Sequence, residues 1–449
     1  MGINGNMKTR ILIYGYLGLA LLAGTVSGEE KTISRPVFTL SECITLGLKQ
    51  AAAARNAQRD EQIAGTRIGQ VRAQVLPHLG AKGSYTRLDE VTAFEFDNER
   101  YEMGRKDNLA AGVEASQLLY SGGSVGAALD AAKLYRAVAR ERVRGVNNEL
   151  VRDIRVAFDD ILLADEQVKV QEASLAQLED LLAQAESRHR QQTASEYDVL
   201  TARVKVANNR PLLIHARKQA ELARASFRNL VQLDPEEFEL SGELAFEPSE
   251  RSLAEWQELG AKQRPELIEQ RKYLGMWEAD IRSERGGYLP QIHAFANYEG
   301  TDPESGSARD TWDWGWNAGV AAEWDIFDGA LRQHKIREKQ LELDKARETL
   351  ADTERQVALE IQTDYLDLQQ AAETVAASRE TVELAEKSLE IARTRYDNGL
   401  ATYLDYTDAN LALRVAQLTR LQALHDHMNA LARLEQASGE EYEEGAKSP

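Results

Sequence analysis

Residues 395–413 read RYDNGLATYLDYTDANLAL, and residues 188–206 read RHRQQTASEYDVLTARVKV, so one stretch answers the other at an offset of 395 − 188 = 207 residues. The same offset carries Phe158 onto Tyr365. Solenoid repeats have much shorter periods, of about 20–50 residues. We therefore infer that the chain contains two copies of one large structural unit, with the pseudo-symmetry of a ring or a tube.

Both copies contain long segments without Gly or Pro, at 146–210, 330–398 and 400–437. They are rich in Ala, Leu, Glu, Gln, Arg and Lys, which favour helix. A helix of about 65 residues would be on the order of 100 Å long, a length typical of coiled coils rather than of compact globules. The expected a/d seam is formed by Val168, Gln171, Leu175, Leu178, Leu182, Ala185 and His189 and by Val375, Ser378, Val382, Ala385, Leu389, Ala392 and Tyr396.

Between the helices the hydrophobic period changes to two, at 79–85 and 108–115 in the first copy and at 312–324 in the second. This alternation predicts strands with one apolar and one polar face. Each copy is expected to hold two strands, joined by polar stretches at 91–107 and 301–311. Each half is thus predicted to run helix, strand, strand, long helix, turn, long helix.

The bulk composition limits the class of protein. The chain has 449 residues, 28% of them charged, a net charge of −19 and a mean hydropathy of −0.48. These values argue against a helical membrane protein, and the negative charge argues against a nucleic-acid partner. A basic start at Lys8 and Arg10, followed by an apolar stretch at 11–23, predicts a signal peptide over 1–28. A retained membrane anchor is the alternative, although the stretch is shorter than the ~20 residues of a spanning helix.

The expected domains follow from these patterns. They are a signal peptide at 1–28, a first repeat at 29–233, a linker or equatorial segment at 234–263, a second repeat at 264–438 and an acidic disordered tail at 439–449. The lone cysteine, Cys43, cannot form an intramolecular disulfide. It lies well past the apolar stretch, so we expect no lipid anchor through it and a buried position on a helix face.

Four strands are too few to close a barrel, and open sheet edges are not tolerated in lipid, so strands that span a membrane would have to come from several chains. At this point the residues also resemble a known family, the TolC-like outer-membrane channels or outer-membrane efflux proteins. The resemblance covers roughly 38–439. It is carried by FTLSECITLGL (38–48), the paired LPHL and LPQI, LLYSGGSVGAAL (118–129), DIFDGALRQHKI (325–336), RPELIEQRKYL (264–274) and the two stretches quoted first.

The resemblance implies a mainly α fold with a small β part. A homotrimer would share one transmembrane β-barrel, with four strands from each protomer, and its coiled-coil helices would form a periplasmic α-barrel. The implied location is the outer membrane of a Gram-negative bacterium, in contact with its lipid. The implied function is passive efflux of small molecules or secretion of proteins. It would use a periplasmic adaptor and, indirectly, an inner-membrane RND, ABC or MFS pump, with no cofactor.

The resemblance also points to a periplasmic gate. Asp405 and Asp408 lie one helical turn apart, so both project from one face, and matching family positions ring the closed entrance. Tyr396 and Asp198 match positions that hold it shut. The alternatives are a solvated helix start for the aspartates and a seam position for Tyr396. Where the family often has a basic brace, this chain has Ala401, so the latch is expected to be weaker or to use Arg395 or other groups.

Further positions follow from the same comparison. The hairpin tips expected to dock an adaptor contain Gln192, Ser195, Gly399 and Thr402. An aromatic belt at the membrane interfaces is expected at Trp312, Trp314, Trp316 and Trp324.

A second hypothesis is a periplasmic coiled-coil scaffold or adaptor that never enters a bilayer, but it gives no reason for the tryptophan-rich alternation. His425 and His427 are two residues apart, a poor spacing for one metal on a helix, and are expected to be surface residues. We recognise no metal site, nucleophile elbow or phosphate loop in the sequence and expect no enzymatic activity.

Overall fold

The computed structural model describes residues 36–96, 99–103, 106–234, 237–302 and 312–441. The predicted signal peptide, most of the acidic tail and most of the polar stretch at 301–311 lie outside these residues. The first half contains β1 (Val37–Thr39), α1 (Leu40–Gln50), α2 (Ala52–Ala73), β2 (His78–Arg87), β3 (Thr92–Phe96), β4 (Glu99–Met103), β5 (Asp107–Tyr120), α3 (Ser124–Arg190) and α4 (Glu196–Val231).

The second half repeats this order, except that its described residues contain no counterpart of the β3–β4 hairpin. It contains β6 (Glu239–Ser241), α5 (Leu253–Gln263), α6 (Pro265–Gly286), β7 (Gln291–Thr301), β8 (Asp313–Glu323), α7 (Leu331–Asp397) and α8 (Tyr403–Ser438). The predicted order of helix, strand, strand, long helix and long helix is confirmed in both halves for the helices and the four longer strands. The sequence missed the β3–β4 hairpin, which occupies the stretch at 91–107 that was expected to be a polar connection.

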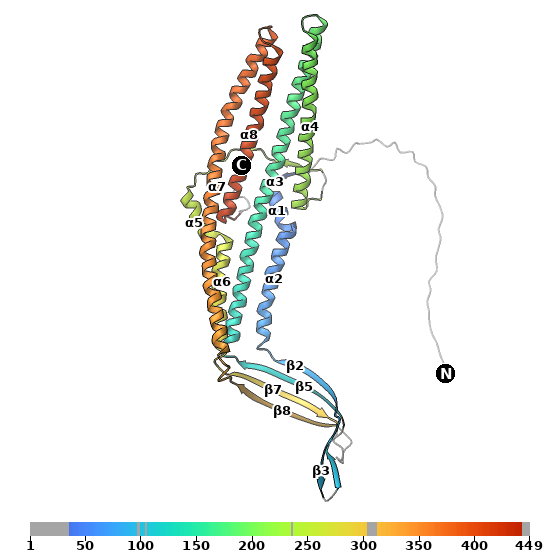
Figure 1. Ribbon diagram of the computed structural model, residues 1–449, viewed down its shortest axis with the longest axis vertical. Coiled ribbons are helices and arrows are strands. Elements are labelled where there is room, and N and C mark those ends of the chain that lie inside the picture. The colour runs from blue at the N-terminus through green and yellow to red at the C-terminus, as the bar shows by residue number, and fades with distance from the viewer. Residues whose placement is uncertain (1–35, 97–98, 104–105, 235–236, 303–311, 442–449) are drawn as a thin grey trace, which may run out of the picture.

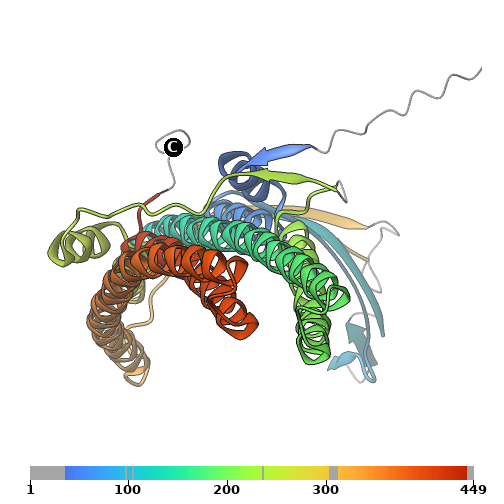
Figure 2. The same cartoon turned by 90° about the horizontal axis from the view of Figure 1, so that it is seen from above.

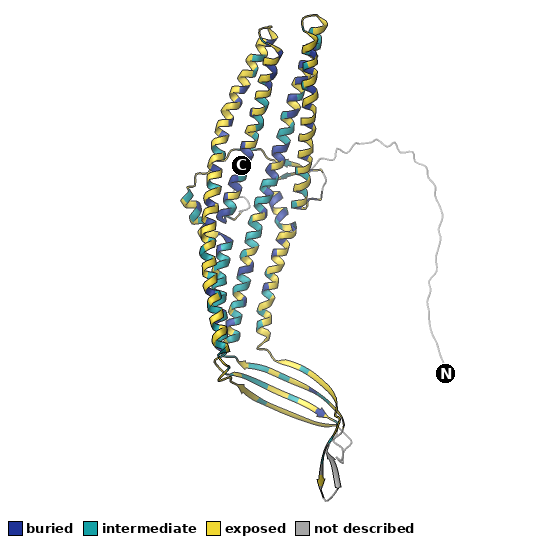
Figure 3. Cartoon of the chain, in the orientation of Figure 1, coloured by how far each residue is buried: buried dark blue, intermediate teal, exposed yellow. Residues whose placement is uncertain are grey.

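The long helices form two hairpins, α3–α4 and α7–α8, that extend away from the sheet (Figure 1). Seen from above, they make one curved layer with α7 at one end and α4 at the other (Figure 2). The predicted seam is confirmed except at its end in the first copy: His189 is exposed, whereas every other residue assigned to the seam in either copy is buried or half-buried. Buried and exposed residues alternate along these helices (Figure 3), as expected for helices that pack on one side only.

The four longer strands form one antiparallel sheet in the order β2-β5-β7-β8. Its register puts the apolar residues of all four strands on one face. Val113 pairs with Tyr298 and Tyr298 with Trp316, all on that face. The opposite face is polar. Most residues of both faces are exposed in the single chain (Figure 3), so the sheet does not cover a core of its own.

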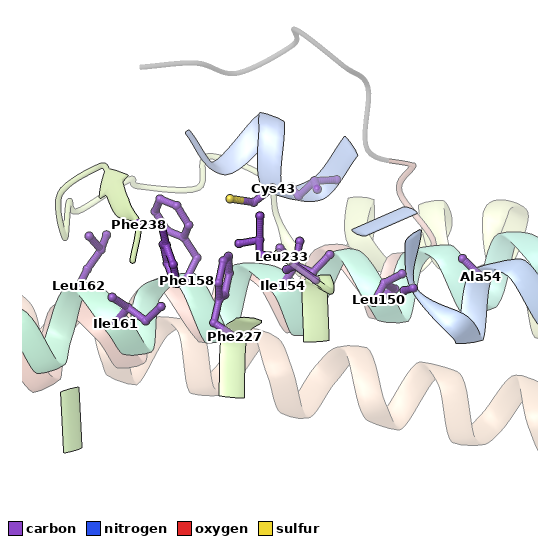
Figure 4. Packing of buried hydrophobic residues seen from close by; sticks show 13 residues of the cluster. Cys43, Ala54, Leu150, Ile154, Phe158, Ile161, Leu162, Phe227, Leu233 and Phe238 are labelled. Atoms are coloured by element: carbon purple, nitrogen blue, oxygen red, sulfur yellow. The ribbon is translucent and has the colours of Figure 1, made fainter. Parts of the chain in front are cut away.

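Residues 237–263 of the middle segment contain β6 and α5 and pack on the rest of the chain. Strand β6 pairs in parallel with β1, and nearby Phe238 packs near Phe227, which in turn makes an edge contact with Phe158 of α3. These rings belong to a buried cluster that joins α1, α3 and α4 to the segment (Figure 4). Cys43 lies in this cluster with no exposed surface, as predicted, and burial raises the pKa of its thiol to about 12.

Candidate functional site

The tip of the α7–α8 hairpin is built by local backbone chemistry. After α7 ends, Gly399 adopts a positive φ of 71°, and its amide donates to the Tyr396 carbonyl. The Leu400 amide then donates to the Arg395 carbonyl at 2.7 Å. These two bonds satisfy carbonyls that a helix end leaves free. The chain thus reverses within a few residues, and this fixes where the side chains of the tip lie.

The first hairpin makes the same turn with a less suitable residue. Gln192 stands where the second copy has Gly399 and has a φ of 58°, a region that costs most non-glycine residues energy. The Thr193 amide donates to the Arg188 carbonyl at 2.9 Å. His189, at the position of Tyr396, has Nδ1 3.1 Å from the Ala194 carbonyl. The two tips therefore share a backbone path but differ in side-chain chemistry.

Both return helices begin with a capping box. The Asp405 carboxylate accepts bonds from the Thr402 amide at 2.8 Å and hydroxyl at 2.7 Å. Ser195 and Asp198 make the same arrangement in the first copy. The bonds from the Thr402 backbone and side chain hold the pKa of Asp405 below its usual range. The Asp198 and Asp405 side chains therefore have a structural role at the helix starts.

The predicted gate residues lie close together at the tips but in different environments. Asp408 is exposed one turn after Asp405, which is also exposed. Tyr396 is only 7% exposed and belongs to a buried cluster at the ends of both hairpins. Ala401 packs against that cluster as a half-buried apolar residue. The predicted seam position of Tyr396 is confirmed, whereas a gating role for these residues stays a prediction.

Sequence reasoning did not identify two tyrosines that surround Tyr396. Its ring stacks on that of Tyr406 at 5.7 Å between centroids and meets the ring of Tyr403 edge-on at 6.4 Å. Burial raises the pKa of Tyr403 to about 12. Among the described residues its buried hydroxyl has no hydrogen-bond partner. The tip is thus held by ring packing. In the sequence, the spacing of Tyr403 and Tyr406, one helical turn apart, was the signal that both rings lie on the same helix face as each other.

The cluster joins the two hairpins. The guanidinium of Arg188, from α3, lies over the Tyr396 ring, with Cζ 4.5 Å from the ring centroid. Farther from the tip, the Asn410 side chain of α8 donates to Gln177 of α3. Within one chain, a cation–π contact from Arg188 to Tyr396 therefore joins the two hairpins near their tips, whereas the predicted latch, weaker or made by Arg395 or other groups, stays a prediction.

The tryptophans lie along and beside β8. Trp314 stacks on Tyr298 of the neighbouring strand at 5.1 Å and on Trp312 at 5.8 Å. Trp316 is 78% exposed on the apolar face of the sheet. Trp324, just beyond the other end of the strand, donates from Nε1 to the Tyr288 carbonyl at 3.0 Å. Exposed aromatic side chains thus occur towards both ends of the strand.

The prediction that His425 and His427 are surface residues was wrong. His427 is 1% exposed and its ring lies 4.6 Å from that of Phe246 in the middle segment. His425 is also buried, with Nε2 2.7 Å from an Asp160 carboxylate oxygen. Both are covered because the middle segment and α3 pack on α8 at this level.

In the described part of the chain, no group of three or more His, Cys, Asp or Glu side chains is arranged to hold a metal ion. No helix among the described residues has both the length and the apolar character needed to span a membrane.

Comparison with known proteins relates this architecture to one group. The chain is 21% identical to the outer membrane efflux protein BepC of Brucella suis biovar 1 (strain 1330), over 93% of this chain and 88% of BepC. It is also 21% identical to the outer membrane protein TolC of Escherichia coli (strain K12), over 83% of this chain and 76% of TolC. The structure matches the Campylobacter jejuni CmeC outer membrane channel with a TM-score of 0.75 at 16% identity, over 91% of this chain and 87% of CmeC.

At such identities the structural match shows the fold alone. A family model described as outer membrane efflux protein, however, matches residues 46–231 and 258–440, well over half of the sequence. The chain therefore belongs to the outer membrane efflux protein family.

Proposed function

We propose that three copies of this chain close into one continuous duct, through which an adaptor and an inner-membrane pump export their cargo. The observation that carries the proposal is a pair of exposed apolar stripes at the two ends of the curved helical layer. On α7 the stripe contains Leu341, Leu359, Leu366, Leu384 and Ile391, all more than half exposed in the single chain. Steps of 18 and 7 residues are close to whole numbers of turns, so these side chains share one face.

The helix at the opposite end of the layer carries a similar stripe. On α4, Tyr197, Val204 and Leu222 are exposed and are separated by the same steps of 7 and 18 residues. Exposed apolar side chains that recur on one face of a helix indicate a face that another element covers. Because α4 and α7 lie at opposite ends of an arc (Figure 2), α4 of one copy packs on α7 of the next, and a head-to-tail contact of this kind closes into a ring.

The sheet supports the same assembly. Within the described chain β2 and β8 each have a neighbour on one side only. In a trimer β2 of one copy pairs with β8 of the next, which gives a barrel of 3 × 4 = 12 strands without an open edge. The apolar face then contacts lipid, and Trp312, Trp314, Trp316 and Trp324 supply aromatic side chains at the membrane interfaces.

The hairpin tips form the periplasmic entrance of the duct. Tyr396 and Asp198 hold the tips together, while Asp405 and Asp408 of three copies place carboxylates around the opening and favour cations. The exposed turns containing Gln192, Ser195, Gly399 and Thr402 are where an adaptor docks and separates the hairpins. The location is the outer membrane, with the helices extending into the periplasm.

The test is to purify the chain in detergent, measure its mass by light scattering, and add it to a planar lipid bilayer. A mass of three chains and small cation-selective current steps are expected. A monomer that leaves the membrane with carbonate and never conducts would instead support the periplasmic scaffold.

A further inference from the structure

A charged triad lies on the polar face of the sheet, remote from the tips. Lys82 of β2 has Nζ 3.3 Å from a carboxylate oxygen of Glu299 on β7 and 3.6 Å from one of Glu114 on β5. The side chains keep 52%, 49% and 53% of their surface exposed, respectively. The three side chains therefore restrain one another and still remain about half exposed to solvent in the single chain.

A glycine makes the contact across β5 possible. Gly112 pairs with Lys82 on one side and with Glu299 on the other, so it lies directly between them. A Cβ at Gly112 would lie 2.8 Å from the Glu299 Cβ, closer than real Cβ contacts allow. Gly80 leaves similar room, since its Cβ would be 3.3 Å from Glu114 Cγ. The backbone thus places Lys82 and Glu299 in one cross-strand row of the sheet and Glu114 in the next row.

The same face carries further negative charge. By the alternation of β8, Asp313 and Glu323 share it with the triad. Lys82 is the one Lys or Arg on the polar face of β2, β5, β7 and β8, all of whose residues the structure describes. One cation and four carboxylates give this face a charge of +1 − 4 = −3 for each chain.

We propose that Lys82, Glu114 and Glu299 form a charged belt inside the barrel that makes the outer-membrane part of the duct prefer small cations to anions. This inference rests on the proposed trimeric barrel. Eight-stranded barrels are filled by side chains and barrels of about 16 strands enclose water, so charges inside a twelve-stranded barrel lie close to permeating ions. Fields of fixed charges extend about 10 Å at 0.1 M salt and about 30 Å at 0.01 M. The preference is therefore strong at low salt and weak at high salt.

The experiment measures reversal potentials of purified protein in a planar bilayer under a potassium chloride gradient, at low and at high ionic strength. The double variant Glu114→Gln/Glu299→Gln is expected to reduce the potassium-to-chloride permeability ratio by about twofold or more at low salt, since fixed charge acts furthest there. Lys82→Gln is expected to raise the ratio. The matched controls Lys82→Arg and Glu299→Asp keep the charge and are expected to keep the ratio.

Thermal stability of the same variants separates the belt from a purely structural triad. If the neutral variants melt earlier but conduct with the wild-type ratio at low salt, the triad only ties strands together and the inference is overturned. The triple variant Lys82→Gln/Glu114→Gln/Glu299→Gln leaves none of the three triad charges without its partner, so it controls for misfolding of the other variants. Wild-type protein that forms no channel would overturn both the duct and the belt, whereas channels with unaltered selectivity would overturn the belt alone.

Discussion

The contact between Arg188 and Tyr396 uses the face of the tyrosine ring rather than its hydroxyl. A cation–π contact contributes about 0.5–2 kcal/mol, depending on how dry it is. Its loss would shift the ratio of closed to open tips by roughly 2- to 30-fold. We expect Arg188→Ala to give larger conductance steps in a bilayer, and Tyr396→Phe, which keeps the ring, to behave as wild type.

Arg395→Ala removes the exposed neighbour of Tyr396, the other basic residue expected to brace the tip, and should leave the step size unchanged if Arg188 is the brace. Larger steps from Tyr396→Phe would show that the hydroxyl closes the tip, and unchanged steps from Arg188→Ala would show that the contact does not contribute to closure.

Asp159 makes stability depend on pH. It is 3% exposed on α3, and burial raises its pKa from 3.8 to about 7, opposed by Arg155 and His425 and supported by Asp160 and Glu247. Between about pH 4 and 7 the folded chain holds a proton that the unfolded chain has lost, so this residue's contribution to stability falls as pH rises. Relative to wild type, we expect Asp159→Asn to gain on the order of 1–4 kcal/mol at pH 8 and little at pH 4.

Thermal melts in detergent at the two pH values would measure this difference, with Asp352→Asn at an exposed position of α7 as the control. An Asp159→Asn protein whose melting temperature follows pH as wild type does would contradict the assignment.

At the scale of elements, the two hairpin turns form a natural matched pair. Gln192 has a φ of 58° and Gly399 one of 71°, a conformation that costs a side chain about 1–2 kcal/mol. Gln192→Gly should therefore stabilise the first turn by up to about 1 kcal/mol, after allowance for the freer unfolded glycine. Gly399→Gln should weaken the second turn by roughly 1–2 kcal/mol.

Hydrogen exchange at the Thr193 and Leu400 amides, which close the two turns, reports each effect locally. Slower exchange at Thr193 in Gln192→Gly and faster exchange at Leu400 in Gly399→Gln are expected. Shifts of the same sign at both turns would be inconsistent with a backbone origin.

The helices and the four long strands could be predicted because their signals are local and periodic. The heptad seam ending at Tyr396 and the alternation around Trp316 each lie within one segment. The β3–β4 hairpin was missed because Glu95, Glu99, Arg100 and Glu102 make its sequence read as a polar loop.

Contacts between distant parts of the chain were also missed. Arg188 and Tyr396 are 396 − 188 = 208 residues apart, and no spacing rule joins them. The burial of His427 depends on Phe246, which lies in a segment without periodicity.

At the scale of the whole molecule, the apolar stripe of α7 is expected to hold the trimer together. Leu384→Glu/Ile391→Glu places two carboxylates in that stripe, and each leucine-sized side chain contributes about 1.5–3 kcal/mol when buried. We expect the double variant to elute from detergent columns as a monomer with normal helix content by circular dichroism.

Ala376→Glu adds a carboxylate at an exposed position of the same helix away from the stripe, and this variant should remain trimeric. A trimeric Leu384→Glu/Ile391→Glu protein would exclude this face as the interface.

The divergence of the two tips has a consequence for symmetry. In the proposed trimer, three chains with two hairpins each build a helical barrel of nearly sixfold symmetry, but His189 and Gln192 stand in one tip where Tyr396 and Gly399 stand in the other. The mouth is therefore strictly threefold, with two chemically distinct kinds of tip in alternation. A ring of six identical subunits placed against it would divide into two classes of three, each with its own binding strength.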